Sequence, residues 1–391
     1  MLNKRIVIAA VVLSFALVIN TNASEIATLA EAKRLSVQTG KLILLEFYHD
    51  DCEYCDQAAR DAETDASIKL AFARVILLKL SVLQGQGTAL ATTYKVGDYY
   101  PVFILTDSTG HTISRWTGYT GVDRFIKSFN QAMSDLMTVD ARVARCQANP
   151  TPKDALFLAD YFTDTREHLS ARDYLRLVQR LYGTGLDFSY RLFTATAEAV
   201  WSDLLPFDSL ITAADDVLAK KQMNMHNLGP MSQIMANVSR KTGHTDKLEK
   251  YLAAGIEATS SRTDAAGIEL HRDLLADYAL HAMGDTTEAL TVKKRALGNR
   301  WEEDMAKCFQ FGEWCFRRNI SLADAEHYVR LATDKAGGDK FRANHLRMLA
   351  EICFARGKTQ EAIQLANQAL TLDPAAVWFE KKLNEWRMAK K

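Results

Sequence analysis

The chain has 391 residues, which is more than one ordinary domain holds and indicates two or three domains. Its 48% of hydrophobic and 25% of charged residues are typical of a soluble globular protein. The formal net charge is zero and the sequence has no long basic run, so we expect no nucleic-acid partner, because such binding depends mainly on positive charge. Six cysteines in a chain of this length exclude a small disulfide-stapled scaffold.

The N-terminal residues have the pattern of a secretory signal peptide. Two basic residues precede an apolar stretch over residues 6–19, and the small residues Thr21 and Ala23 precede a predicted cleavage site. These 14 apolar residues are short for a membrane span, which needs roughly 20. We therefore expect residues 1–23 to be removed and the chain to be exported, to the periplasm or the outside, where disulfides persist. The alternative is an uncleaved segment that anchors the chain to the membrane.

The most informative stretch is residues 42–55, which read LILLEFYHDDCEYC. The apolar run over residues 42–48 predicts a strand buried on both faces, and a polar turn joins it to Cys52 and Cys55, after which the pattern becomes helical. A helix start carries partial positive charge and free N–H groups, which stabilise a thiolate. The thiolate is the form that attacks disulfides, and a second cysteine about one turn later can resolve the mixed disulfide.

The segments around this motif alternate between strand and helix patterns. Together they predict the order β-α-β-α-β-β-α, an α/β domain with a mixed sheet and helices on both faces. The expected helices lie at residues 25–39, 56–60, 67–73, 88–94 and 121–137, and the expected strands at residues 42–48, 74–82, 101–106 and 111–116.

Four features of residues 24–138 follow one another in a recognisable order. The C-x-x-C motif ends the first long strand, and Glu46 stands six positions before the first cysteine, where thioredoxins keep a buried carboxylate. Tyr100-Pro101 opens a later strand, where that family has a cis-proline beside the disulfide, and residues 116–119 close the sheet before the last helix. The segment therefore resembles the thioredoxin superfamily, and more narrowly its secreted thioredoxin-like branch.

The resemblance implies a role for each residue of a candidate active site. Cys52 would be the exposed nucleophile and Cys55 the resolving thiol, and Glu46 would be a buried proton acceptor for Cys55. Pro101, if cis, would shape the peptide-binding groove and keep metal off the thiols, and Tyr100 would contact the substrate backbone. The alternatives are a Glu46 carboxylate at the wet end of its strand, a trans Pro101, and a Tyr100 that is only a surface aromatic.

The motif departs from the family pattern in its charge. Asp51 replaces the aromatic residue that usually precedes the first cysteine, and Glu53-Tyr54 replaces Gly-Pro between the cysteines. With Asp50 and Asp56 nearby, negative charge crowds the thiols, which raises the pKa of a thiol and makes the pair a better reductant. The helix dipole acts in the opposite direction. We expect a reductase in preference to an oxidase; alternatively, Glu53 and Asp56 only serve the helix start.

A metal site at this motif is an alternative reading. His49 lies three positions before Cys52, and with both cysteines it would offer three ligands. A closed zinc site needs four ligands, and the sequence has no second C-x-x-C. We therefore expect no metal, and interpret His49 as a solvated turn residue or a modulator of Cys52.

The strand patterns end near residue 138, and residues 139–391 predict an all-α domain. Helical segments alternate there with short glycine and proline breaks, as antiparallel helix pairs would. Ala289, Ala325 and Ala362 recur at spacings of 36 and 37 residues, where small side chains let two helices approach closely. The domain resembles a tetratricopeptide solenoid. Its clearest units are expected at residues 270–300, 306–337 and 343–376.

Four further cysteines follow the first domain. Cys308 and Cys315 are seven positions apart on one helix, roughly 10 Å, which is too far for a disulfide. We expect these two, with Cys146 and Cys353, to be buried as small apolar side chains. The alternative is a structural disulfide, for example between Cys315 and Cys353.

These patterns predict an exported thiol–disulfide oxidoreductase that acts through Cys52 and Cys55 on disulfide-containing or thiol proteins. The helical repeats would hold the partner protein and raise its effective concentration. The resemblance implies a membrane thiol carrier as the electron donor, and the chemistry needs no metal or organic cofactor. Two alternatives stay open: a non-catalytic interaction scaffold with a structural C-x-x-C, and a metal-delivery protein.

Overall fold

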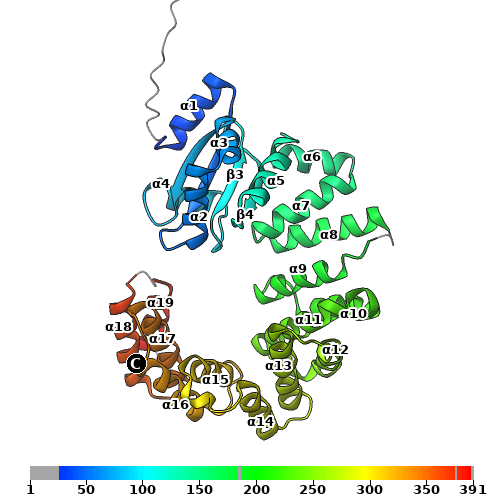
Figure 1. The fold of residues 1–391 in the computed structure, drawn as a ribbon. Helices are drawn as coiled ribbons and strands as arrows, with labels where there is room; N and C mark the ends of the chain where they lie inside the picture. Colours follow the sequence, from blue (N-terminus) through cyan, green and yellow to red (C-terminus); the bar gives the residue numbers. More distant parts are fainter. Residues whose placement is uncertain (1–25, 184–185, 375–376, 389–391) are drawn as a thin grey trace, which may run out of the picture. The chain divides into compact units, whose positions relative to one another are not determined.

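The computed structural model describes residues 26–183, 186–374 and 377–388, and the chain divides after Arg166 into two compact units (Figure 1). The predicted signal peptide, residues 1–23, lies outside the described residues. No helix in the described part has both the length and the apolar character that crossing a membrane requires.

The first unit is built on a four-stranded mixed sheet in the order β2-β1-β3-β4 (Figure 1). β1 (Leu42–Tyr48) runs parallel to β2 (Val75–Ser81) and antiparallel to β3 (Val102–Thr106), which pairs antiparallel with β4 (Thr112–Thr117). The predicted order of strands and helices is confirmed. The helices of this unit are α1 (Leu29–Thr39), α2 (Glu53–Thr64), α3 (Ala66–Ala73), α4 (Gly85–Thr93), α5 (Val122–Met133), α6 (Val139–Ala148) and α7 (Pro152–Asp164).

The side chains of β1 alternate between two apolar layers, because successive residues of a strand point to opposite faces. Ile43, Leu45 and Phe47 pack into the layer that includes residues of α1 and α4. Leu44 faces the other layer, which holds Phe103 and residues of α2, α3 and α5. Five of the seven residues of β1 are buried, as expected for a strand covered on both faces.

α4 approaches the end of β2 very closely. A Cβ atom at Gly87 of α4 would fall 1.9 Å from the carbonyl oxygen of Ser81, so only glycine fits there. One residue further, Thr88 Oγ1 donates to the Val82 carbonyl oxygen at 3.0 Å. These two contacts fix the loop that follows β2, residues 82–84.

α6 and α7 belong to the sheet unit, so the division after Arg166 differs from the predicted boundary at residue 138. Both helices contact β4, and a buried ion-pair network joins them to each other. Asp154, in the first turn of α7, accepts hydrogen bonds from Arg142 at 3.0 Å and from Arg145 at 2.6 and 2.9 Å. Helical periodicity in the sequence does not show on which partner these two helices pack.

The described part of the second unit is helical, and consecutive helices pack against each other. The predicted repeat units correspond to the pairs α13–α14, α15–α16 and α17–α18, and the spaced alanines Ala289, Ala325 and Ala362 are fully buried. The tetratricopeptide-like architecture is therefore confirmed. The helices are α8 (His168–Tyr182), α9 (Ser189–Trp201), α10 (Phe207–Ala219), α11 (Lys221–Thr242), α12 (Glu249–Thr259), α13 (Ala265–His281), α14 (Thr286–Leu297), α15 (Met305–Arg317), α16 (Leu322–Asp334), α17 (Asp339–Ala355), α18 (Thr359–Leu372) and α19 (Val377–Met388), with 3-10 turns η1 (Thr245–Lys247) and η2 (Trp301–Glu303).

The four cysteines outside the motif, Cys146, Cys308, Cys315 and Cys353, are buried and free. This confirms their expected role as small apolar side chains, and the alternative disulfide between Cys315 and Cys353 is not formed. Burial raises the pKa of Cys315 to about 12 and that of Cys353 to about 11. These two thiols are therefore protonated and unreactive at neutral pH.

We predict that Asp154→Ala destabilises the sheet unit by about 3 kcal/mol, because it leaves a buried charge without its main partner. The Arg142 side chain is only 2% exposed, and in this variant it would keep one ion-pair partner, Asp135, at 3.1 Å. Hydrogen exchange of peptides from α6, α7 and β4 at increasing denaturant measures the change. The control is Asp140→Ala, since that side chain on α6 is 82% exposed and its loss costs less than about 0.5 kcal/mol. Equal effects of the two substitutions would show that the network does not hold the unit together.

Candidate active site

Four chain segments meet at one edge of the sheet. β1 and β2 both end there, since Tyr48 pairs with Ser81 in their parallel register. β3 begins at the same edge, because its first residue, Val102, pairs with Phe47, and β4 ends there, because Thr117 also pairs with Val102. The turn after β1, the loop after β2, the start of β3 and the end of β4 therefore lie together.

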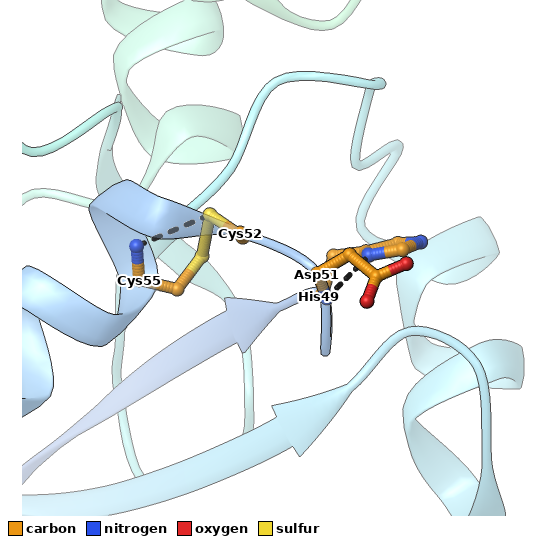
Figure 2. The surroundings of a disulfide bond; sticks show 4 residues. All are labelled: His49, Asp51, Cys52 and Cys55. Atoms are coloured by element: carbon orange, nitrogen blue, oxygen red, sulfur yellow. Dashed lines mark hydrogen bonds between the residues drawn. A yellow bond between two sulfur atoms is a disulfide. The ribbon is translucent and has the colours of Figure 1, made fainter. Parts of the chain in front are cut away.

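Cys52 and Cys55 form a disulfide at the N-terminus of α2, with their Cα atoms 5.1 Å apart (Figure 2). Cys52 is the N-cap residue of α2, and its Sγ accepts a hydrogen bond from the Cys55 backbone N–H at 3.1 Å. Cys55 is 5% exposed, whereas Cys52 is partly exposed. An incoming thiolate therefore reaches the Cys52 sulfur first, and the N–H donor and the helix dipole stabilise negative charge on it once it is released.

Glu46 is buried on the side of the sheet that α2 covers. It is two residues from Leu44 in β1, so the two side chains share the layer formed with α2, α3 and α5. The residue is 4% exposed, which contradicts the alternative of a carboxylate at the wet end of the strand. Burial raises the pKa of Glu46 above its usual value, and the charge of Lys79 offsets this in part. Such a carboxylate takes up a proton more readily than an exposed one, as a proton acceptor needs.

The Tyr100–Pro101 peptide bond is cis, and Pro101 is buried where β3 begins. The Pro101 carbonyl oxygen accepts the Gly118 N–H at 2.7 Å, which ties the start of β3 to the end of β4. Tyr100 is half-buried, and its ring centroid lies 5.8 Å from that of His49. The trans alternative for Pro101 is therefore wrong. Contact of Tyr100 and Pro101 with a substrate stays a prediction.

A histidine holds the turn between β1 and α2. His49 Nδ1 accepts the Asp51 backbone N–H at 3.1 Å (Figure 2). Figure 2 shows the ring directed away from the disulfide. His49 is thus placed as a turn residue that helps to deliver Cys52 to the helix, and its Nδ1 is already in use.

The described residues offer a cluster of metal-ligating atoms elsewhere, in the second unit. Ligand atoms of Glu326, Cys353 and Glu361 lie within 4.8 Å of one another. Arg330 pairs with both glutamates, at 2.9 and 2.7 Å, and Lys358 pairs with Glu326 at 2.7 Å. Protein cations thus already neutralise these carboxylates, which argues for an ion-pair network in preference to a metal site.

The four acids around the thiols, Asp50, Asp51, Glu53 and Asp56, are all exposed. Water and salt screen the effect of exposed charges on a nearby sulfur. The helix N-terminus, by contrast, contacts the Cys52 sulfur at hydrogen-bond distance. In the structure, the helix N-terminus therefore affects the stability of the Cys52 thiolate more strongly, and the four acids affect it less strongly, than their positions in the sequence indicate.

Sequence reasoning did not bring together three exposed apolar residues of the segments at this edge, here called the apolar rim: Tyr54, Leu83 and Tyr99. Their exposed fractions are 57%, 56% and 76%. They come from three segments at the active-site edge, namely the start of α2, the loop after β2 and the approach to the cis-proline. Large exposed apolar side chains on neighbouring segments are candidates for a contact surface. Only the sheet register brings Leu83 to this edge, since in the sequence it is an ordinary loop residue.

Comparison with known proteins adds to this picture. A family model described as thioredoxin-like matches residues 24–108. The solution structure of a thioredoxin from Thermus thermophilus is 23% identical and aligns with 27% of this chain and 85% of its own, at a TM-score of 0.25. YrrB, described as a TPR protein with an unusual peptide-binding site, is 13% identical and aligns with 63% of this chain and 98% of its own, also at a TM-score of 0.25. No curated protein matches the chain.

The family model covers the segment that supplies the central strand, the C-x-x-C helix and the cis-proline. The overall likeness to the two solved structures is low, so the assignment rests on that model and on the observed elements. The chain therefore has an N-terminal thioredoxin-like domain with a Cys52–Cys55 disulfide, and a tetratricopeptide-like helical region follows it.

Proposed function

We propose that this protein is an exported thiol–disulfide oxidoreductase that reduces or exchanges disulfides in partner proteins. One observation carries the proposal: a disulfide at a helix N-terminus has one partly exposed sulfur, Cys52, and lies on the side of the sheet where Glu46 is buried. The apolar rim supports a protein substrate, because its exposed side chains lie on segments that meet at the same sheet edge as the disulfide. Export is supported by the signal-peptide pattern of residues 1–23.

In the reducing direction the Cys52 thiolate attacks one sulfur of a substrate disulfide. A mixed disulfide forms and the other substrate sulfur leaves as a thiolate. Cys55 then gives its proton to Glu46 and attacks the Cys52 sulfur, which releases the second substrate thiol and leaves the Cys52–Cys55 disulfide. Two electrons have passed to the substrate, so a dithiol donor must reduce the protein again. We infer a membrane thiol carrier for this step from the resemblance to exported thioredoxin-like proteins.

The direction of electron flow follows from two opposing effects on the Cys52 thiolate. The four exposed acids disfavour the thiolate and so favour the disulfide, which makes a stronger reductant. The helix N-terminus favours the thiolate. We propose a reductase because the family's strongest oxidants need a highly stabilised thiolate. The four acids, although water and salt screen them, still oppose the helix N-terminus and work against a thiolate of that kind.

We predict a reversible two-electron couple for Cys52 and Cys55 with a reduction potential near that of thioredoxin, about −270 mV. Equilibration of the protein with dithiothreitol or glutathione buffers, followed by thiol alkylation, measures it, with Cys52→Ser as the blank. A potential near −120 mV, typical of a strong oxidant, would reverse the proposed direction. Absence of any reversible couple would leave the interaction scaffold, with a structural disulfide, as the function.

We also predict that Cys55→Ser traps partner proteins in mixed disulfides with Cys52, because the resolving thiol is gone. Cys52→Ser should trap at least about tenfold less, since Cys55 is buried. Non-reducing electrophoresis of the purified variants with a disulfide-containing test protein, with and without dithiothreitol, measures the adducts. Equal trapping by the two variants would contradict the assignment of Cys52 as the nucleophile.

We predict that the Glu46 carboxyl makes the stability of the sheet unit depend on pH. Its raised pKa means that the folded state holds a proton over a pH range in which the unfolded state, with a pKa of about 4.3, has lost it. Stability therefore falls as the pH rises through that range. Glu46→Gln should remove this fall and stabilise the sheet unit at neutral pH, while it slows resolution of the mixed disulfide by roughly a hundredfold.

Denaturant unfolding at pH 5 and pH 8 and stopped-flow resolution kinetics measure the two effects of Glu46→Gln. Glu63→Gln is the matched control, since Glu63 is an exposed carboxylate on α2 and should change neither. Unchanged kinetics with a changed pH dependence would show that Glu46 is buried but takes no part in the exchange.

A further inference from the structure

A hollow of about 590 Å³ opens in the second unit between α9, α11 and the end of α15. This volume falls within the range of ligand sites, roughly 300–1,000 Å³. Its apolar wall is formed by Ala197, Ile234 and Val238, and Trp201 stands beside it at the end of α9 with 45% of its surface exposed. A tryptophan this exposed in a concave site offers apolar contact area to a ligand.

Three cationic side chains, Arg240, Lys241 and Arg317, also line the hollow. Lys241 Nζ lies 4.8 Å from the centre of the Trp201 ring and donates to the Trp201 carbonyl oxygen. Arg317 donates two hydrogen bonds to Glu313, at 2.6 and 2.9 Å. These contacts hold the cations in place before any ligand arrives, which lowers the entropic cost of binding.

The acids that anchor these cations are not among the lining residues. Arg317 is anchored by Glu313, Lys241 lies 3.8 Å from Asp203, and Arg240 lies 3.4 Å from Asp277. Each cation is thus held by an acid outside the wall of the hollow, while the wall itself carries three positive charges.

The Arg240 charge is only partly balanced. Arg318 donates two shorter hydrogen bonds to the same carboxylate, Asp277, at 2.6 and 2.8 Å. Burial and the charge of Arg318 lower the pKa of Arg240 to about 10, so it is still charged at neutral pH. Glu198 is the acidic residue among those that line the hollow, and it is exposed. The lining charges therefore favour an anionic occupant.

We propose that this hollow binds a segment of a partner polypeptide that presents a carboxylate next to an apolar side chain. The inference rests on the proposed function, because it names the feature by which the helical region holds its partner. Tryptophan and arginine are the residues that most often dominate protein interfaces, and charge complementarity selects an acidic segment over a neutral or basic one. A small inorganic anion would leave Trp201 uncovered, and a basic segment would meet three cations.

The test uses the full chain and three short fluorescent peptides in a Gly/Ser background. The first carries glutamate beside leucine, and the second and third carry glutamine or lysine in place of glutamate. Fluorescence anisotropy at low and at physiological salt measures binding. We expect the glutamate peptide to bind, to lose affinity as salt rises, and to bind at least about tenfold more tightly than the other two.

Three substitutions in the wall locate the site. Trp201→Ala should weaken binding of the glutamate peptide by about thirtyfold, the size of an interface hot spot. Arg317→Gln should weaken it about threefold, as expected for one exposed charge pair. Glu198→Gln should tighten binding about twofold, since it removes the lining acid; damage to the fold would not produce such a gain.

Arg300→Gln is the matched control for the arginine. Arg300 is likewise exposed and donates two hydrogen bonds to a neighbouring glutamate, Glu303, but does not line the hollow. Circular dichroism of each variant checks its fold. Equal affinity for the glutamate and glutamine peptides, no binding of either, or the same loss in Arg300→Gln as in Arg317→Gln would overturn the proposal.

The same preparations separate this inference from the proposed function. Exchange of Cys52 and Cys55 with a small disulfide reagent does not depend on the hollow, so the wall variants should leave its rate unchanged. Intact exchange without peptide binding would refute the hollow as a docking site and leave the oxidoreductase in place. Peptide binding without a reversible thiol couple would refute the oxidoreductase and leave the hollow in place as a docking site.

Discussion

The pairing of β1 determines where the Cys52–Cys55 disulfide and the cis-proline lie. β1 lies between a parallel neighbour, β2, and an antiparallel one, β3, so the ends of β1 and β2 and the start of β3 fall at one edge of the sheet. That edge receives the disulfide, the cis-proline and the apolar rim. A slip of one residue would turn Glu46 to the opposite face of the sheet and away from α2, because side chains alternate along a strand. The tight, apolar packing of β1 prevents such a slip.

The pKa values of two buried acids of the sheet unit are shifted in opposite directions. Asp154 is also buried, but hydrogen bonds from Arg145, Arg142 and Thr151 outweigh its burial and lower its pKa. At Glu46 burial dominates and the pKa is raised. An apolar residue would serve the strand better at this position, so a fold selected for stability alone would not keep a carboxylate there. Conflict between local packing and residue type is expected where a residue serves chemistry.

The sequence was most informative where one element decides the outcome. The apolar run over residues 42–48 predicted the limits of β1, and the C-x-x-C indicated a helix N-terminus at this motif, although α2 begins at Glu53, three residues before the expected segment. Features that depend on distant partners were not accessible in this way. The packing of α6 and α7 on the sheet unit depends on Asp154 and its arginines, and the place of Leu83 at the active-site edge depends on strand register. The hollow beside Trp201 needs three helices that are far apart in the sequence.

The two proposed sites of the protein carry charges of opposite sign. The surroundings of Cys52 carry four exposed acids, which repel an acidic segment of a partner. The wall of the hollow carries three cations and attracts the same segment. A partner with an acidic, partly apolar segment would therefore dock on the helical region and offer a different, less acidic part of its chain to the disulfide. Docking would then supply effective concentration, and the thioredoxin-like domain could act on disulfides with little sequence preference of its own.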